Sequence, residues 1–243
     1  MNENRNSADA FVARLLSLDF ELDRSNPLSV QVYQLLRQAI VTMTLQPDDV
    51  IFDRTLAEAL DVSRTPVREA LLQLSREELV RIAAQSGTFV APVMREQVAE
   101  SALIREALET ASIRRAAEII TPAELDQLND IQAAHRRAIE RENAIAAIRC
   151  DNDFHAAVCA AARLKRVQHL VELARAPIDR VRHVTVRDPV VRNETLEQHQ
   201  LVLEALSRHD PDGAERALRN HLADAFAHQQ VTYDENVALF QGR

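Results

Sequence analysis

Apolar residues recur every three or four positions through most of this chain, the spacing at which one face of a helix meets a core. The first stripe, within the N-terminal extension 1–26, predicts a short amphipathic helix and consists of Phe11, Leu15, Leu18 and Leu22. The second begins after Pro27 and consists of Leu28, Val32, Leu35, Leu36 and Ile40. After a turn from Met43 to Val50, a third helix is predicted from Asp53, as its N-terminal cap, to about Leu60.

A fourth helix is predicted to begin at Ser63, which can cap it by accepting a hydrogen bond from the amide of Thr65. Pro66 lies in the first turn, where its missing N–H leaves no intrahelical bond unmade. The core-facing stripe of this helix consists of Val67, Ala70, Leu71 and Leu74. Together with the preceding helix, this pattern is typical of a helix-turn-helix.

Arginines occupy the opposite face of the fourth helix. Arg64 and Thr65 lie at its N-terminal end, which a recognition helix presents to DNA base edges, and Arg68 follows one turn later. Arg54, at the exposed start of the preceding helix, is placed to contact a phosphate. The spacing alone fits an ordinary surface helix with scattered arginines equally well. These four residues and Ser63 are therefore candidates for DNA binding because of their context.

Two short strands are expected next, Leu79 to Ile82 and Thr88 to Ala91, joined by a hairpin whose Gly87 permits a tight turn. From Pro27 to Val93 the chain resembles the winged-helix domain of the GntR family of bacterial transcription factors, most specifically in the run VSRTPVREAL. The resemblance implies that the hairpin is a wing whose tip enters the minor groove. Gly87 would then allow close approach of the backbone to DNA.

The family pattern usually has glycine where this chain has Met43, Asp48, Asp61 and Glu78. Glycine adopts positive φ angles at little cost, whereas residues with a Cβ do so less readily. We still expect the winged fold despite these departures. The turn before the recognition helix is where they put the family pattern in question.

Beyond Pro92 the chain is predicted to be helical throughout. Thr121 to Glu124 forms a capping box with proline at the first helical position. Six or seven helices are expected, at roughly 95–120, 122–141, 143–162, 165–185, 189–208 and 211–232, allowing for one break. The predicted fold is therefore mostly α, with a winged helix-turn-helix domain over 27–93 and an all-α antiparallel bundle over 94–243.

Composition supports a helical protein, since 3 glycines and 8 prolines leave little room for sheet. No apolar run approaches the roughly 20 residues needed to cross a bilayer, and the N-terminus lacks a basic region followed by an apolar one. We therefore expect a cytoplasmic protein without membrane association. Cys150 and Cys159 fall on opposite sides of one predicted helix and cannot pair, as expected in a reducing compartment.

The formal net charge of −8 argues against a protein that coats nucleic acid without discrimination. Between Pro27 and Val93, six arginines oppose eight acidic residues, a balance of −2. DNA binding must therefore depend on where the charges are placed. Lys165 is the single lysine, so nearly all cationic contacts are guanidinium groups, which suit guanine edges and phosphates.

Ionisable residues interrupt the apolar stripes of three predicted bundle helices. Asp151 and His155 are four positions apart and share one inward face, while His199 and His221 interrupt the stripes of two later helices. A buried carboxylate without a partner costs several kcal/mol, so these groups are expected to meet one another or a cation. Any one of the histidines is more often an ordinary core or surface residue. Together, one carboxylate and three imidazoles suit a divalent metal ion such as Zn²⁺ or Ni²⁺.

The bundle resembles the FadR-type ligand-sensing domain (FCD), in which an Asp-x-x-x-His pair and two later histidines hold a metal, and the four residues above match that pattern. In that family a small carboxylate effector completes the metal's coordination, and an arginine on the first bundle helix often pairs with it. Arg105 occupies that place, although an intrahelical pair with Glu109 is an equal alternative. The family commonly has Gly-Asn where this chain has Arg163-Leu164, which puts the shape of that turn in question.

The resulting hypothesis is a homodimeric GntR-family regulator of the FadR-like branch, where most members repress. It would bind a two-fold symmetric double-stranded DNA operator and sense a small carboxylic acid. An enzyme is not expected, because all four inferred ligands come from the protein and no spare acid has the spacing of a general base. The alternatives are a metal-dependent hydrolase and a dimerisation module with no bound metal.

Overall fold

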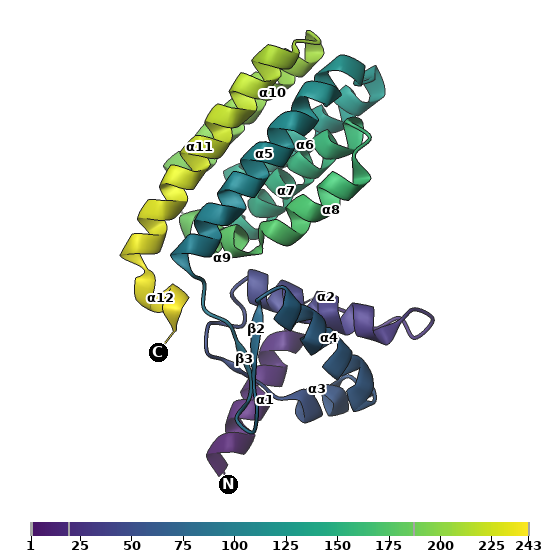
Figure 1. Cartoon of the computed structure of the whole chain (residues 1–243), viewed down its shortest axis with the longest axis vertical. Helices are drawn as coiled ribbons and strands as arrows, with labels where there is room; N and C mark the ends of the chain where they lie inside the picture. The colour runs from purple at the N-terminus through teal and green to yellow at the C-terminus, as the bar shows by residue number, and fades with distance from the viewer. Residues whose placement is uncertain (1, 19, 187, 243) are drawn as a thin grey trace. The chain divides into compact units, whose positions relative to one another are not determined.

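The computed structural model describes residues 2–18, 20–186 and 188–242. Within these ranges the chain forms twelve helices and one three-stranded sheet, which confirms the prediction of a mostly helical protein. The chain divides into two compact units, each visible in Figure 1. One contains the residues up to Met94 together with the segment from Asn236 onward, and the other runs from Arg95 to Glu235.

The first unit has a three-helix core made by α2 (Leu28–Val41), α3 (Asp53–Ala59) and α4 (Arg64–Arg76). Helix α4 packs against both α2 and α3. The stripe predicted for α4 is fully buried, and so is that of α2 except for Leu28, which is half-buried at the helix start. The helix-turn-helix pattern of the sequence is thus present in the structure.

The sheet of this unit consists of β1 (Val50–Ile51), β2 (Val80–Ala83) and β3 (Gly87–Val90), in the order β1-β3-β2 with antiparallel pairing. The β2–β3 hairpin was predicted, whereas β1 lies where only a turn was expected. Two residues are too few to show an alternating pattern, and β1 exists because it pairs with β3, far along the chain. Its register, Val50 opposite Phe89, anchors the base of the wing to the turn before α3.

The N-terminal extension belongs to this unit. It forms α1 (Asn2–Leu16), which contacts α2 and α3. Phe11 and Leu15 are buried, and the Phe11 ring meets Phe52 edge-on with centroids 5.9 Å apart. The helix ends before Leu18 and Leu22, so the predicted stripe is only half helical. Helix α1 thus extends the core of the first unit.

Two predicted caps are absent. Ser63 occupies the N-cap position of α4 but makes no capping hydrogen bond through its side chain. A cap side chain accepts from the second or third helical amide. Pro66 has no amide hydrogen, which leaves the Thr65 amide as the one possible donor, and the Ser63 side chain does not accept from it. Asp53 is the first residue inside α3, after Phe52, rather than its cap. Its carboxylate is instead directed to Arg64, 2.6 Å away.

All five positions where the related families favour glycine adopt left-handed backbone geometry. The φ angles are 57° at Met43, 65° at Asp48, 51° at Asp61, 58° at Glu78 and 64° at Arg163. The turns therefore keep the geometry that glycine would provide, although each residue carries a Cβ that disfavours it. The surrounding helices and strands hold these turns in place.

In the described residues, the second unit is a bundle of seven helices. They are α5 (Arg95–Ile119), α6 (Pro122–Glu140), α7 (Ala144–Ala161), α8 (Lys165–Ala174), α9 (Ala176–Thr185), α10 (Pro189–Ser207) and α11 (Pro211–Glu235). Helix α5 packs along α11 and α7, while α10 packs against α11 and α6 (Figure 1). The predicted capping box is present at the start of α6. A continuous apolar core includes Ile113, Phe154, Leu203 and Leu218.

The helix expected over 165–185 is divided into α8 and α9 at Arg175. Pro177 explains the break, because it has no N–H to donate and its ring clashes with the preceding turn of a continuous helix. The division changes the direction of the chain and gives α9 its own contacts with α5, α7 and α11.

The C-terminal segment differs from the expected domain boundary. Helix α12 (Val237–Gln241) groups with the first unit rather than with the bundle. Its Phe240 is fully buried, and the Phe240 carbonyl accepts a hydrogen bond from the Val93 amide at 2.7 Å. Residues 95–235 thus form the bundle. The sequence did not predict this boundary, because the helical pattern of α12 does not reveal that Phe240 has its partner in Val93, far earlier in the chain.

Among the described residues, no helix is both long and apolar enough to cross a membrane. Cys150 and Cys159 are free thiols, which confirms that they do not pair. The pKa of the Cys159 thiol is raised to about 11, mainly because the side chain is buried.

We predict that Met43→Gly is more stable than Met43→Ala. Both variants lose the same side chain, but only glycine escapes the left-handed penalty of about 1–2 kcal/mol. Glycine loses more backbone entropy on folding, which offsets about 0.5–1 kcal/mol of this advantage. The free energy of unfolding, measured with denaturant, should therefore be about 0.5–1 kcal/mol higher for Met43→Gly than for Met43→Ala. Equal stability, or a more stable alanine variant, would mean that the turn at this position stores no backbone strain.

Candidate metal centre and DNA-reading surface

Three bundle helices bring together the four polar side chains singled out in the sequence. Asp151 and His155 come from α7, His199 from α10 and His221 from α11, and all four are buried. One potential ligand atom from each lies within 4.8 Å of all the others. We call this group the four-residue cage.

The spacing within the cage suits a single small cation. Nε2 of His155 lies 3.3 Å from Nε2 of His221 and 3.7 Å from Oδ2 of Asp151, while Nε2 of His199 lies 3.6 Å from Oδ1 of Asp151. Two ligands bound at about 2.0–2.1 Å in tetrahedral geometry stand about 3.3–3.4 Å apart. The distances between these atoms are therefore close to those between two ligands of one metal ion.

His199 shows most directly that the cage fits a cation. Its side chain is fully buried, and within the described residues neither ring nitrogen has a hydrogen-bond partner. Its ring stacks on Phe154 with centroids 4.0 Å apart, which fixes its orientation. A buried polar atom left unpaired costs about 1–3 kcal/mol. A cation bound at Nε2 would satisfy this nitrogen.

The other two imidazoles are oriented by outer hydrogen bonds. Nδ1 of His155 donates to Glu109 at 2.6 Å, and Nδ1 of His221 donates to the side-chain oxygen of Gln198 at 2.9 Å. The contacted atom is an acceptor oxygen in both cases, so each Nδ1 carries a proton and each Nε2 faces the cage. Hydrogen bonding of this kind is how proteins orient histidine ligands toward a metal.

Protonation favours metal binding at this site. Burial lowers the pKa of His199 well below its usual range and that of His221 to about 3, so both imidazoles are neutral at pH 7. Burial opposes ionisation of Asp151, but the neighbouring positive charges, chiefly Arg182 at 2.8 Å, hold the pKa of its carboxyl well below the usual value. Two neutral imidazoles and an ionised carboxylate are the forms that bind metals.

Arg105 forms the intrahelical pair that the sequence offered as one alternative. Its Nε donates to Glu109 at 2.7 Å, and both side chains are buried. Glu109 therefore joins Arg105 to His155. Arg105 also lines a cavity beside the cage, so this pairing does not remove it from the reach of a ligand.

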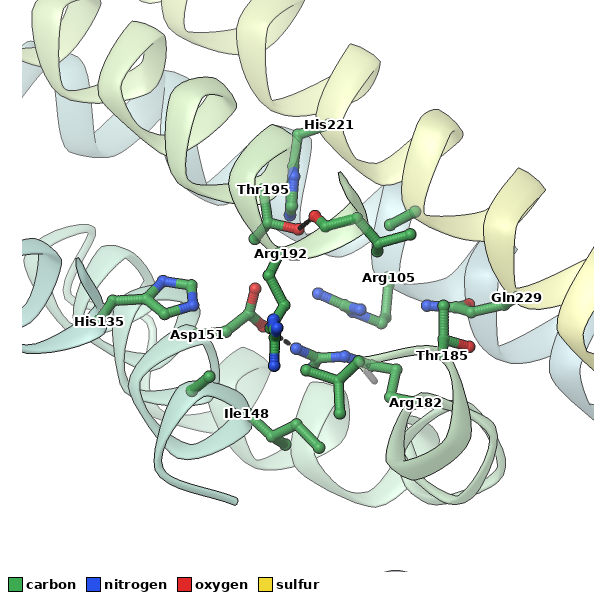
Figure 2. Close-up of a pocket in the computed structure, with 14 residues that line it drawn as sticks. Arg105, His135, Ile148, Asp151, Arg182, Thr185, Arg192, Thr195, His221 and Gln229 are labelled. Atoms are coloured by element: carbon green, nitrogen blue, oxygen red, sulfur yellow. Dashed lines mark hydrogen bonds and ion pairs between the residues drawn. The ribbon is translucent and has the colours of Figure 1, made fainter. Parts of the chain in front are cut away.

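The cavity has a volume of about 40 Å³, room for about three water molecules at roughly 10–15 Å³ each. Figure 2 shows side chains from several helices converging on it, with Asp151 and His221 of the cage in its wall. Its polar lining also includes Arg105, His135, Arg182, Thr185, Arg192, Thr195 and Gln229. Sequence reasoning missed most of these residues. They lie on several helices that are far apart along the chain, so their convergence depends on packing between helices.

The DNA-binding candidates lie on the surface of the first unit. Ser63, Arg64, Thr65 and Arg68 are exposed at the start of α4, with 49% and 62% of the two arginine side chains accessible to solvent. Asp53 of α3 lies 2.6 Å from Arg64 and 3.7 Å from Arg68. The carboxylate thus holds both guanidinium groups on the same face of α4.

The remaining candidates are Arg54 and Gly87. The Arg54 side chain is 78% exposed and pairs with Glu58 one turn later, a contact that solvent weakens. Gly87 opens β3 at the end of the hairpin turn, with φ 117°, which residues with a Cβ rarely adopt. This agrees with the requirement for glycine at the tip of the predicted wing.

Comparisons with known proteins agree with this arrangement. Residues 28–90 match the model of bacterial regulatory proteins of the gntR family, and residues 100–224 match the FCD domain. The chain belongs to the GntR family. It is 31% identical over 225 residues to the HTH-type transcriptional repressor RspR of Escherichia coli (strain K12), covering 93% of this chain and 99% of that protein.

Other similar proteins are also regulators. The HTH-type transcriptional repressor NanR of Escherichia coli (strain K12 / DH10B) is 30% identical over 202 residues, which cover 70% of this chain and 72% of that protein. The solved structure of E. coli McbR/YncC is similar with a TM-score of 0.76 and 26% identity, over 85% of this chain and 98% of that one. A putative GntR regulator from Rhodococcus sp. RHA1 has a TM-score of 0.72 at 25% identity, over 84% and 98%. This GntR-family chain with an FCD domain is therefore a transcriptional regulator and not an enzyme.

Proposed function

We propose that this GntR-family protein is a homodimeric repressor whose affinity for a two-fold symmetric operator is controlled by a small carboxylic acid bound beside a divalent cation. The observation that carries the proposal is the convergence of Asp151, His155, His199 and His221, with both His199 ring nitrogens unpartnered within the described residues. Three imidazoles and one carboxylate suit Zn²⁺, Ni²⁺ or a similar ion. When bound, the ion would supply a Lewis-acidic position for a carboxylate oxygen.

The cavity beside the cage supports the sensing of a small acid. Arg105 and Arg182 line it, as do the hydroxyl-bearing side chains of Thr185 and Thr195. A guanidinium group forms strong bidentate hydrogen bonds with a carboxylate. A ligand in this cavity would touch α5, α7, α9, α10 and α11, whose side chains line it.

In the DNA-binding unit, we assign base recognition to Arg64, Thr65 and Arg68, with Ser63 near the backbone. Arg54 would contact a phosphate, and the wing would approach the minor groove through Gly87. Asp53 keeps Arg64 and Arg68 in place before DNA binds. In a dimer, effector binding would alter the separation of the two recognition helices, and a small change lowers operator affinity because half-site spacing is geometric.

The metal and effector sites can be tested by thermal unfolding of the full chain. We expect Zn²⁺ or Ni²⁺ at 100 times its dissociation constant to stabilise the protein by about 2.7 kcal/mol. This raises the melting temperature by about 5–10 °C. Small carboxylic acids should raise it further, and chelator should abolish both effects. His199→Ala should also abolish both, whereas His169→Ala, which alters an exposed histidine of α8, should not.

Stabilisation by carboxylic acids that survives chelator would contradict a shared metal and effector site. The absence of any metal effect in the wild-type protein would instead favour a dimerisation module without a metal.

The roles of the arginines can be separated on DNA. With a binding site selected by the protein from random sequences, Arg64→Ala should cost about 1–3 kcal/mol at one base position because it removes a base contact. Arg54→Ala should weaken selected and random DNA alike, because phosphates carry no sequence information. A gel-shift panel in which both variants lose affinity equally on selected and random DNA would contradict this division.

A further inference from the structure

One arginine in the wall of the cavity differs from the other two. Arg192, in the first turns of α10, is only 9% exposed, and its Nε has no hydrogen-bond partner in the described part of the chain. No described carboxylate forms an ion pair with it. By contrast, Arg105 pairs with Glu109 and Arg182 pairs with Asp151.

A buried charge without a partner is costly, because desolvation of an ion is compensated only by a nearby opposite charge. Arg192 could avoid the cost by extending into solvent, as long arginine side chains usually do. Instead it extends from α10 into the cavity, as Figure 2 shows, toward the side where Asp151 and Arg182 lie. Its guanidinium group is therefore available to an anion that enters the cavity.

The charges around the cavity also favour a ligand with more than one negative charge. The three arginines at positions 105, 182 and 192 oppose two carboxylates, Glu109 and Asp151, which leaves one positive charge. Asp179 touches Arg182 but also pairs with Arg175, so these two charges cancel. A divalent cation in the four-residue cage would raise the total from one to three.

We propose that Arg192 binds a second acidic group of the effector, which makes the effector a short dicarboxylate. This inference rests on the proposed function, in which the cation and the cavity bind a small acid. One carboxylate lies at the cation and the other pairs with Arg192 across the cavity. A cavity volume of about 40 Å³ argues against a long chain.

The test compares ligands that differ in one carboxylate. Succinate and butyrate share a four-carbon chain, and malonate and propionate share a three-carbon chain. Each is titrated calorimetrically into the full-length protein loaded with Zn²⁺ or Ni²⁺. In the wild-type protein each dicarboxylate should bind at least tenfold more tightly than its matched monocarboxylate, because it gains a charge-assisted pair with a buried guanidinium group.

Arg192→Gln should weaken the dicarboxylates at least tenfold and change the monocarboxylates less than twofold. Arg192→Lys, which keeps the charge but loses the planar fork, should recover part of the difference. Arg166→Gln, which removes an exposed arginine of α8 outside the cavity, is the control and should leave all four affinities unchanged. The Arg192→Gln variant should stay folded, since it removes an unpaired buried charge.

Equal binding of succinate and butyrate by the wild-type protein would overturn the inference, as would equal losses for both in Arg192→Gln. In those cases the proposed function survives if the monocarboxylate still binds only when metal is present. If none of the four acids binds the metal-loaded protein, the proposed function and this inference both fail.

Discussion

The bundle is constrained above all by the burial of four polar side chains in an apolar core. Asp151 and the three histidines are almost fully buried, and His199 has no hydrogen-bond partner in the described part of the chain. Such groups destabilise a fold unless something compensates them. Outer contacts from Glu109 and Gln198 orient His155 and His221 with Nε2 toward the cage. In our proposal, a bound cation compensates these groups and makes the cluster the centre of ligand sensing.

Placement of charge, rather than its total, also explains the DNA-binding unit. The chain carries a net charge of −8, yet Arg64 and Arg68 are exposed together at the start of α4. Asp53 contacts both side chains without burying them, which restricts their conformations and leaves them exposed to solvent. In both units an acidic residue orients arginines or histidines, and in both the oriented groups face a position where a ligand is expected.

Local patterns revealed much of this protein, and non-local packing accounts for the rest. Helical periodicity predicted the core residues of α4, because they form an apolar stripe. It also predicted the four cage residues, because they interrupt the apolar stripes of their helices. Other features depend on partners far along the chain. They are strand β1, the packing of α12 through Phe240, and the positions of Arg182 and Arg192 in the cavity wall. The five non-glycine turns kept positive φ because the packed elements on either side determine their path.

The central claim is that the four-residue cage holds a divalent cation, and the metal content of the purified protein tests it most directly. After reconstitution with Zn²⁺ or Ni²⁺ and removal of unbound metal, elemental analysis should find one ion per chain in the wild-type protein. A folded Asp151→Asn variant should bind far less, because it lacks the anionic ligand. A wild-type protein that keeps no more metal than this variant would contradict the account.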